Sequence, residues 1–163
     1  MWSLIAALSY PQRIIGKEGK LPWHLPLELR LFRQQTWGGI LVVGRRTLET
    51  LPLPLPGRDV WVLSHSLAPQ GDYYRVFPNP ESLLQALSDV PKPVFFAGGA
   101  SLYAWALQLP QLQKMFLTWV FLSVEGDTFF PFFAEHEWSL QRWELFTDKG
   151  IPFIRAEYER NSR

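Results

Sequence analysis

Glu28 is the residue of this chain whose type and position could do the most chemistry. Pro26 suits the first turn of a helix, where its missing N–H costs nothing, and the residues that follow favour a helix. At helical spacing Glu28 projects beside an apolar face made of Leu25, Leu29 and Phe32. A carboxylate in such surroundings loses hydration, so its pKa rises and it needs a partner, which can be a ligand. The alternative is a boundary glutamate that turns out to water.

Three predicted strands end in residues that could hold a phosphate-bearing ligand. The first runs into Gly-Arg-Arg-Thr at 44–47, the second ends at Ser-His-Ser at 64–66, and the third ends at the glycine pair 98–99. Helix starts, guanidinium groups and closely approaching backbone all suit phosphates. Because ligands of open α/β sheets bind at the carboxyl ends of strands, the three segments predict one site. The alternatives are solvated arginines, a polar turn and a tight strand-to-helix turn.

Other segments could serve the same site. Arg58 follows a stiff proline-rich loop at 51–57, which suits a clamp on a carboxylate but also fits an exposed arginine. Residues 125–128 follow the strand that contains Thr118, and they could form only a turn. No G-x-G-x-x-G fingerprint occurs, which disfavours the standard dinucleotide fold.

The elements that must position these residues alternate along the chain. Strands are expected at 3–8, 40–43, 60–63, 94–96 and 114–124, and helices at 27–35, from 44, from 80 with Asn79 as cap, and at 100–109. Two final strands, 138–145 and 153–158, form an antiparallel pair. This order predicts an α/β fold with a mainly parallel twisted sheet of about eight strands, an antiparallel C-terminal edge strand and about four flanking helices.

Size and composition exclude several classes of protein. The 163 residues fit one domain, 1–163, and 47% of them are hydrophobic. A net charge of +1 gives no sign of a nucleic-acid or membrane-surface protein, and the absence of cysteine excludes disulfides and thiolate chemistry. The three histidines are too scattered for a metal site. Without a signal peptide or membrane span, we expect a soluble, cytoplasmic monomer.

In order along the chain, these motifs resemble the dihydrofolate reductase family. Each is weak alone, but the ordered set covers nearly the whole chain. The matching pieces are 3–7, 15–16, 21–23, the Glu28 helix with Phe32, 43–47, 55–58, 98–99, Tyr103, 117–118 and 125–128. The resemblance implies reduction of 7,8-dihydrofolate to 5,6,7,8-tetrahydrofolate by hydride transfer from NADPH, a step of one-carbon metabolism and an antifolate target. Because the chain stops after one domain, we expect no fused thymidylate synthase.

The resemblance implies a pterin pocket around Glu28. This carboxylate would bond to the pterin amino group and the neighbouring ring nitrogen, while water entering beside Leu21 would donate the proton. Thr118 would hydrogen-bond Glu28, and Trp23 would help to position the water. The further substrate residues implied are Ile5, Ala6, Leu29, Phe32 and Leu51, with Arg58 gripping the α-carboxylate of the glutamate tail.

The resemblance also implies an NADPH site without a metal. Two arginines at a helix start would favour the 2′-phosphate, the Gly98–Gly99 peptide would be cis, and residues 16–23 would form a mobile loop over the nicotinamide. The cofactor residues implied are Ala7, Ile15, Gly16, Gly44, Arg45, Arg46, Thr47, Leu63, Ser64, His65, Gly98, Gly99, Ala100, Ser101, Leu102, Tyr103 and Thr128.

Three residues depart from common bacterial members, and two alternatives stay open. Glu28 is the longer acid where many have Asp, Leu53 stands where an arginine or lysine is frequent, and His65 replaces a small polar residue. The enzymatic alternative is the pyrimidine reductase of riboflavin synthesis, which shares the general fold and NADPH. The non-enzymatic alternative is a folate- or NADPH-binding protein without activity.

Overall fold

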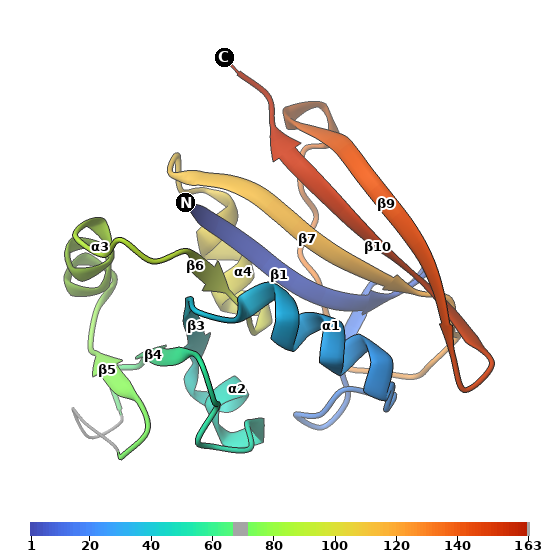
Figure 1. The fold of residues 1–163 in the computed structure, drawn as a ribbon, viewed down its shortest axis with the longest axis horizontal. Coiled ribbons are helices and arrows are strands. Elements are labelled where there is room, and N and C mark those ends of the chain that lie inside the picture. Colours follow the sequence, from blue (N-terminus) through green and yellow to red (C-terminus); the bar gives the residue numbers. More distant parts are fainter. Residues whose placement is uncertain (67–71, 163) are drawn as a thin grey trace.

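The computed structural model describes residues 1–66 and 72–162, and its main feature is an eight-stranded sheet (Figure 1). The strands lie side by side in the order β5-β4-β3-β6-β1-β7-β10-β9. Their bounds are β1 Trp2–Ser9, β3 Ile40–Gly44, β4 Asp59–Leu63, β5 Arg75–Phe77, β6 Val94–Phe96, β7 Leu112–Val120, β9 Trp138–Asp148 and β10 Ile151–Arg160. β2 (Ile14–Gly16) and β8 (Thr128–Phe129) form a second, two-stranded sheet.

The pairing confirms the fold expected from the sequence. The five contacts between neighbours from β5 to β7 are all parallel. β10 pairs antiparallel with both β7 and β9, so β9 forms an antiparallel edge. Parallel strands place their carboxyl ends together, and the ends of β1, β3 and β6 therefore meet at one edge of the sheet.

Helices cover both faces of the sheet, and each helix packs against the strand residues that point to its own face. α1 (Pro26–Thr36) and α2 (Arg45–Thr50) lie on the face that contains Ile5, with Phe32 and Leu48 packed there. α3 (Pro80–Ser88) and α4 (Ala100–Leu107) cover the opposite face, where Leu83 and Leu102 join the core. Figure 1 shows α1 in front of the sheet and α4 behind it.

Several boundaries differ from those expected. β7 ends at Val120 because the chain turns there, with the Leu122 N–H donating to the Val120 carbonyl at 2.9 Å. α4 ends at Leu107, two residues earlier than predicted. β2, β5 and β8 were not predicted, since strands of two or three residues carry almost no pattern. The expected cap of α3 is confirmed by the Ser82 N–H, which donates to Asn79 Oδ1 at 2.8 Å.

Two adjacent glycines after α1 give a matched stability test. A Cβ on Gly39 would lie 2.8 Å from the Pro93 carbonyl oxygen and 2.9 Å from the Phe95 ring, both in or beside β6. Gly38 has a φ of 82° and nothing within 4 Å of a Cβ. We expect Gly38→Ala to cost about 1 kcal/mol of unfolding free energy through backbone strain alone, and Gly39→Ala about 2 kcal/mol or more through the clash. Urea unfolding measures both, and equal costs would contradict the packing described at β6.

Candidate active site

Glu28 is buried and lines a cleft between α1 and the sheet. Only 6% of the residue is exposed, and the cleft has a volume of about 170 Å³. Burial raises the pKa of Glu28 from its ordinary 4.5 to about 7, and the positive charge of Arg155 opposes this rise. A side chain buried to this degree does not fit the alternative of a boundary glutamate. A carboxyl that titrates near neutral pH is suited to acid–base chemistry.

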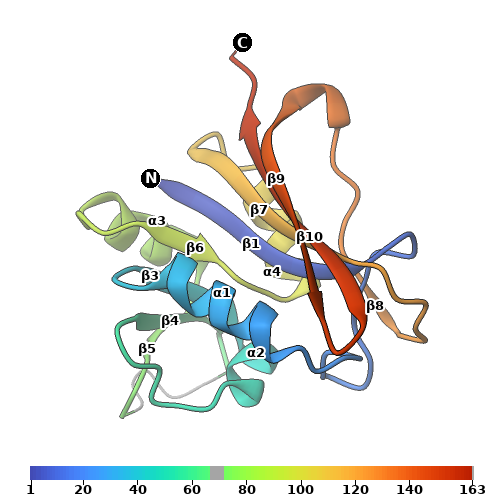
Figure 2. The same ribbon diagram turned by 45° about the vertical axis from the view of Figure 1, so that its right-hand side comes forward.

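Contacts at the start of α1 fix the position of Glu28. The Leu27 N–H donates to Asp148 Oδ2 at 2.9 Å, so a carboxylate from the end of β9 satisfies a free N–H of the first helical turn. Buried Leu25, just before the helix, packs with Val120 and Phe153 of the sheet. Figure 2 shows the tip of the β9–β10 hairpin beside the start of α1. Sequence reasoning missed Asp148, because a cap 121 residues away leaves no local signal.

Thr118 lies on the sheet below Glu28. It is buried, it lines the same cleft, and it is in register with Ala7 of β1 and Arg155 of β10. Within the described residues no hydrogen bond joins Thr118 to Glu28, so the bond implied by the resemblance stays a prediction.

The other substrate residues are brought together only in part. Ile5 and Phe32 line the cleft, and Leu51 packs in the same apolar cluster. The side chain of Ala6 points to the opposite face, into the cluster with α4, because successive strand residues alternate. Leu29 is 44% exposed, so it does not share the buried face that helical spacing predicted.

Trp23 and Leu21 lie in the loop before α1. The Trp23 indole N–H is buried and has no hydrogen-bond partner among the described residues. A buried donor of this kind calls for an acceptor, and a water molecule or a ligand atom would satisfy it. Leu21 is 44% exposed.

Arg58 has a second arginine as its neighbour. Burial, and then the positive charge of Arg33, lower the pKa of Arg58. The Arg33 guanidinium lies 5.3 Å from the ring centroid of Trp37, and a Cβ on Gly57 would collide with that ring. α1 and the loop before β4 therefore carry two adjacent cations. Sequence reasoning missed Arg33, although its spacing of one helical turn from Leu29 was available as a signal.

A glycine cradle forms where β3 and β6 end. The Gly44 N–H donates to the Gly98 carbonyl at 2.8 Å, and the Gly98–Gly99 peptide is cis. Gly98 has a φ of 127°, and a Cβ there would lie 3.1 Å from Thr47 Oγ1. The Tyr103 N–H donates to the Gly99 carbonyl at 2.9 Å. A side chain at Gly98 would crowd Thr47, and the bare glycine backbone fits close approach by a phosphate-bearing ligand.

The other residues expected to bind the cofactor come from several strands and helices. Arg45 and Arg46 are exposed at the start of α2, where Arg45 forms a 3.7 Å ion pair with Glu49. Ser64 is buried and its hydroxyl accepts from the Ser66 N–H, whereas His65 is exposed. The others lie at the end of β1 or β4, in β2, at the start of β8, or in the first turn of α4: Ala7, Leu63, Ile15, Gly16, Thr128, Ala100, Ser101 and Leu102.

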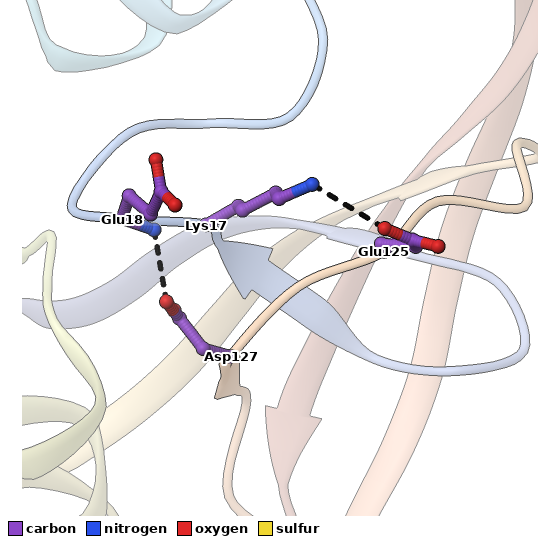
Figure 3. Close-up of polar contacts among 4 residues, drawn as sticks. All are labelled: Lys17, Glu18, Glu125 and Asp127. Carbon is purple, nitrogen blue, oxygen red and sulfur yellow. Dashed lines mark hydrogen bonds and ion pairs between the residues drawn. The ribbon is translucent and has the colours of Figure 1, made fainter.

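The loop that begins at Gly16 is tied to the loop before β8 (Figure 3). The Glu18 N–H donates to Asp127 Oδ2 at 2.9 Å, and the Asp127 N–H donates to the Gly16 carbonyl at 3.1 Å. Lys17 and Glu125 add a 3.4 Å ion pair. The N–H of Glu18, and then the hydroxyl of Thr128, hold the pKa of Asp127 below its usual range. These contacts fix the first residues of the loop, and Leu21 and Trp23 lie farther along it.

Within residues 1–66 and 72–162, no three His, Cys, Asp or Glu side chains gather to hold a metal ion. There, too, no helix is long and apolar enough to cross a membrane.

Comparisons with known proteins give one consistent result. The family model described as dihydrofolate reductase matches residues 1–160. The chain is 40% identical over 136 residues to dihydrofolate reductase type 3 of Salmonella typhimurium, covering 83% of this chain and 82% of that protein. It is 35% identical over 141 residues to dihydrofolate reductase of Haemophilus influenzae, covering 86% and 84%. Among solved structures, dihydrofolate reductase from Enterococcus faecalis, complexed with NADP(H) and RAB-propyl, matches with a TM-score of 0.91 and 31% identity over 99% of this chain and 97% of that one.

The raised pKa of Glu28 predicts that this residue costs stability at neutral pH. The folded protein holds a proton on Glu28 up to about pH 7, whereas the unfolded chain releases it near 4.5, so stability falls as pH rises between these values. Glu28→Gln removes this penalty. Without ligands, we expect the variant to be about 1–3 kcal/mol more stable than the parent at neutral pH and to lose this advantage below about pH 4. Urea unfolding across this range measures it, and a difference that does not change with pH would contradict the shift.

Proposed function

This chain belongs to the dihydrofolate reductase family, and we propose that Glu28 is the acid–base and orienting group of its pterin pocket. The chain is an NADPH-dependent oxidoreductase that reduces 7,8-dihydrofolate to 5,6,7,8-tetrahydrofolate. The resemblance inferred from the sequence is thereby confirmed. The match to this family model favours dihydrofolate reductase over the two alternatives, the pyrimidine reductase and the inactive binding protein.

One observation supports this role of Glu28 most strongly. Its carboxyl is almost fully buried, and burial raises its pKa to about 7. In its charged form it accepts hydrogen bonds from the pterin amino group and the neighbouring ring nitrogen, which orients the ring and favours protonation beside the carbon to be reduced. Thr118 shares the cleft and steadies the carboxylate. The buried N–H of Trp23 holds a water molecule, and water reaching the ring beside Leu21 delivers the proton.

The residues around the glycine cradle fit the cofactor. When bound, NADPH supplies the hydride for the reaction. The cradle of Gly98 and Gly99 admits the pyrophosphate, and Thr47 donates to it. Arg45 and Arg46 stand exposed at the start of α2, where their guanidinium groups suit the 2′-phosphate.

The adjacent arginines suit the outer end of the substrate. Arg58 grips the α-carboxylate of the glutamate tail, and the nearby Arg33 adds a second positive charge. Arg33 thus offsets Leu53, which replaces the arginine or lysine frequent in bacterial members. We propose that the protein works as a monomer. We place it in the cytoplasm, where dihydrofolate and NADPH are available.

The role of Glu28 is tested by Glu28→Gln, which keeps the shape of the side chain and removes its charge. We expect turnover at neutral pH to fall by about 10²-fold or more, measured as NADPH oxidation with dihydrofolate, and the loss to shrink at low pH. Glu144→Gln is the matched control, because Glu144 lines the same cleft but is exposed. Activity of Glu28→Gln equal to the control across pH would reduce Glu28 to a structural residue.

The phosphate role of the two arginines is tested by cofactor choice. NADH lacks the 2′-phosphate, so Arg45→Ala and Arg46→Ala should each weaken NADPH binding by about 1–3 kcal/mol and leave NADH binding nearly unchanged. Titration of protein fluorescence with each cofactor gives both affinities. A loss of the same size for NADPH and NADH would show that the arginines support the fold instead.

A further inference from the structure

A row of polar side chains crosses the sheet beneath α1. Arg155 of β10 is in register with Thr118 of β7 on one side and with Glu144 of β9 on the other. Side chains in register on neighbouring strands point to the same face of a sheet. Thr118, Arg155 and Glu144 therefore share one face, and all three line the cleft that contains Glu28. The pairing of β10 with β7 therefore fixes Arg155 beside Thr118, in the cleft that also contains Glu28.

Of the two arginines that line this cleft, Arg155 is the one whose charge is not matched by an ion pair with another carboxylate. The other one, Arg142, has a side chain 78% exposed and pairs with Glu157 at 3.5 Å. Glu157 also pairs with Lys114 at 3.7 Å, so its charge is already matched. Among the described residues the Arg155 side chain has no ion pair or hydrogen bond, and the carboxylates whose charge acts on it are Glu28 and then Glu144.

The fold also holds the two elements in place relative to one another. The Leu27 N–H bonds to Asp148 at the end of β9, and Asp148 is paired with Ile151 at the start of β10. Glu28 follows Leu27 directly, and Arg155 lies four residues beyond Ile151 on the same strand. The start of α1 is therefore attached to the hairpin that carries the arginine.

We propose that Arg155 is a positioning residue for the reaction, whose guanidinium in the shared cleft keeps the Glu28 carboxylate charged for the incoming pterin. Burial alone favours the protonated carboxyl, and Arg155 opposes burial by lowering the pKa of Glu28. A protonated carboxyl accepts hydrogen bonds poorly, so without Arg155 fewer molecules at neutral pH can bind the ring. The inference rests on the proposed role of Glu28.

The other ionisable groups near Glu28 do not replace Arg155. Burial raises the pKa of Tyr103 on α4 well above its usual range, which keeps this phenol neutral. The remaining charged groups of the cleft are Arg142 and Glu144 from β9 and Glu157 from β10. Of these, Arg142 and Glu157 pair with each other, and Glu144 is a further negative charge that acts on Arg155.

The test compares Arg155→Met with the parent protein. The affinity of each for dihydrofolate is measured by fluorescence titration at two pH values. This variant removes the charge and keeps an apolar chain of similar length. We expect the midpoint of the pH dependence of binding to rise by about one pH unit, so that affinity falls about fivefold at about pH 7 and is nearly restored at about pH 9, where Glu28 is ionised in both proteins. Arg155→Lys keeps the charge and should stay within about twofold of the parent.

Matched controls separate the possible outcomes. Arg142→Gln removes a positive charge from the same cleft and should leave the pH dependence unchanged. If Arg155→Met weakens binding equally at both pH values, or if Arg155→Lys behaves like it, the role of Arg155 is structural and the inference is overturned. If Arg155→Met binds as the parent does while Glu28→Gln loses activity, only this inference fails. If Glu28→Gln keeps full activity across pH, the proposed function of Glu28 itself fails.

Discussion

The burial of one carboxylate, Glu28, is the constraint on which the rest of the site depends. A charged group in an apolar pocket is unfavourable by several kcal/mol unless it is protonated or paired. This protein uses both solutions in part, since burial raises the pKa of Glu28 to about 7 while Arg155 opposes the rise. The unbound protein therefore contains an incompletely matched carboxyl, and we propose that the hydrogen-bond donors of a pterin match it. Function here costs stability, as is common for acid–base groups in active sites.

The cleft that contains Glu28 and the glycine cradle lie on different strands of the same sheet and are linked through Tyr103. β1 contributes Ile5 to the cleft, and the Ile5 carbonyl accepts a 2.8 Å hydrogen bond from the hydroxyl of Tyr103 on α4. The backbone of Tyr103 in turn bonds to Gly99 of the cradle. A short chain of buried contacts thus connects the cleft with the glycine cradle. Because these contacts lie in a tightly packed core, the two regions hold a fixed spacing, which a transfer between two bound molecules requires.

The sequence predicts what local pattern can encode. Apolar runs at β1, β3, β4 and β6, the Asn79 cap and the glycine pair at 98–99 were all expected from neighbouring residues. The roles of Asp148 and Arg155 were not, because both depend on contacts between segments that are far apart in the sequence. Asp148 accepts from the first turn of α1, and the pairing of β10 with β7 places Arg155 beside Thr118. Helical spacing also grouped Leu29 with the buried side chains, whereas the sheet below α1 admits Glu28 and leaves Leu29 exposed.

The most direct test of the central claim is the titration of the Glu28 carboxyl itself. Carbon-13 NMR of the ligand-free protein labelled at glutamate follows each side-chain carboxyl with pH, and the resonance missing from Glu28→Gln identifies the one in question. We expect a midpoint of about 7 for this resonance. A midpoint near the ordinary value of 4.5 would show that the carboxylate is solvated, and it would contradict the buried acid–base group on which the proposed mechanism rests.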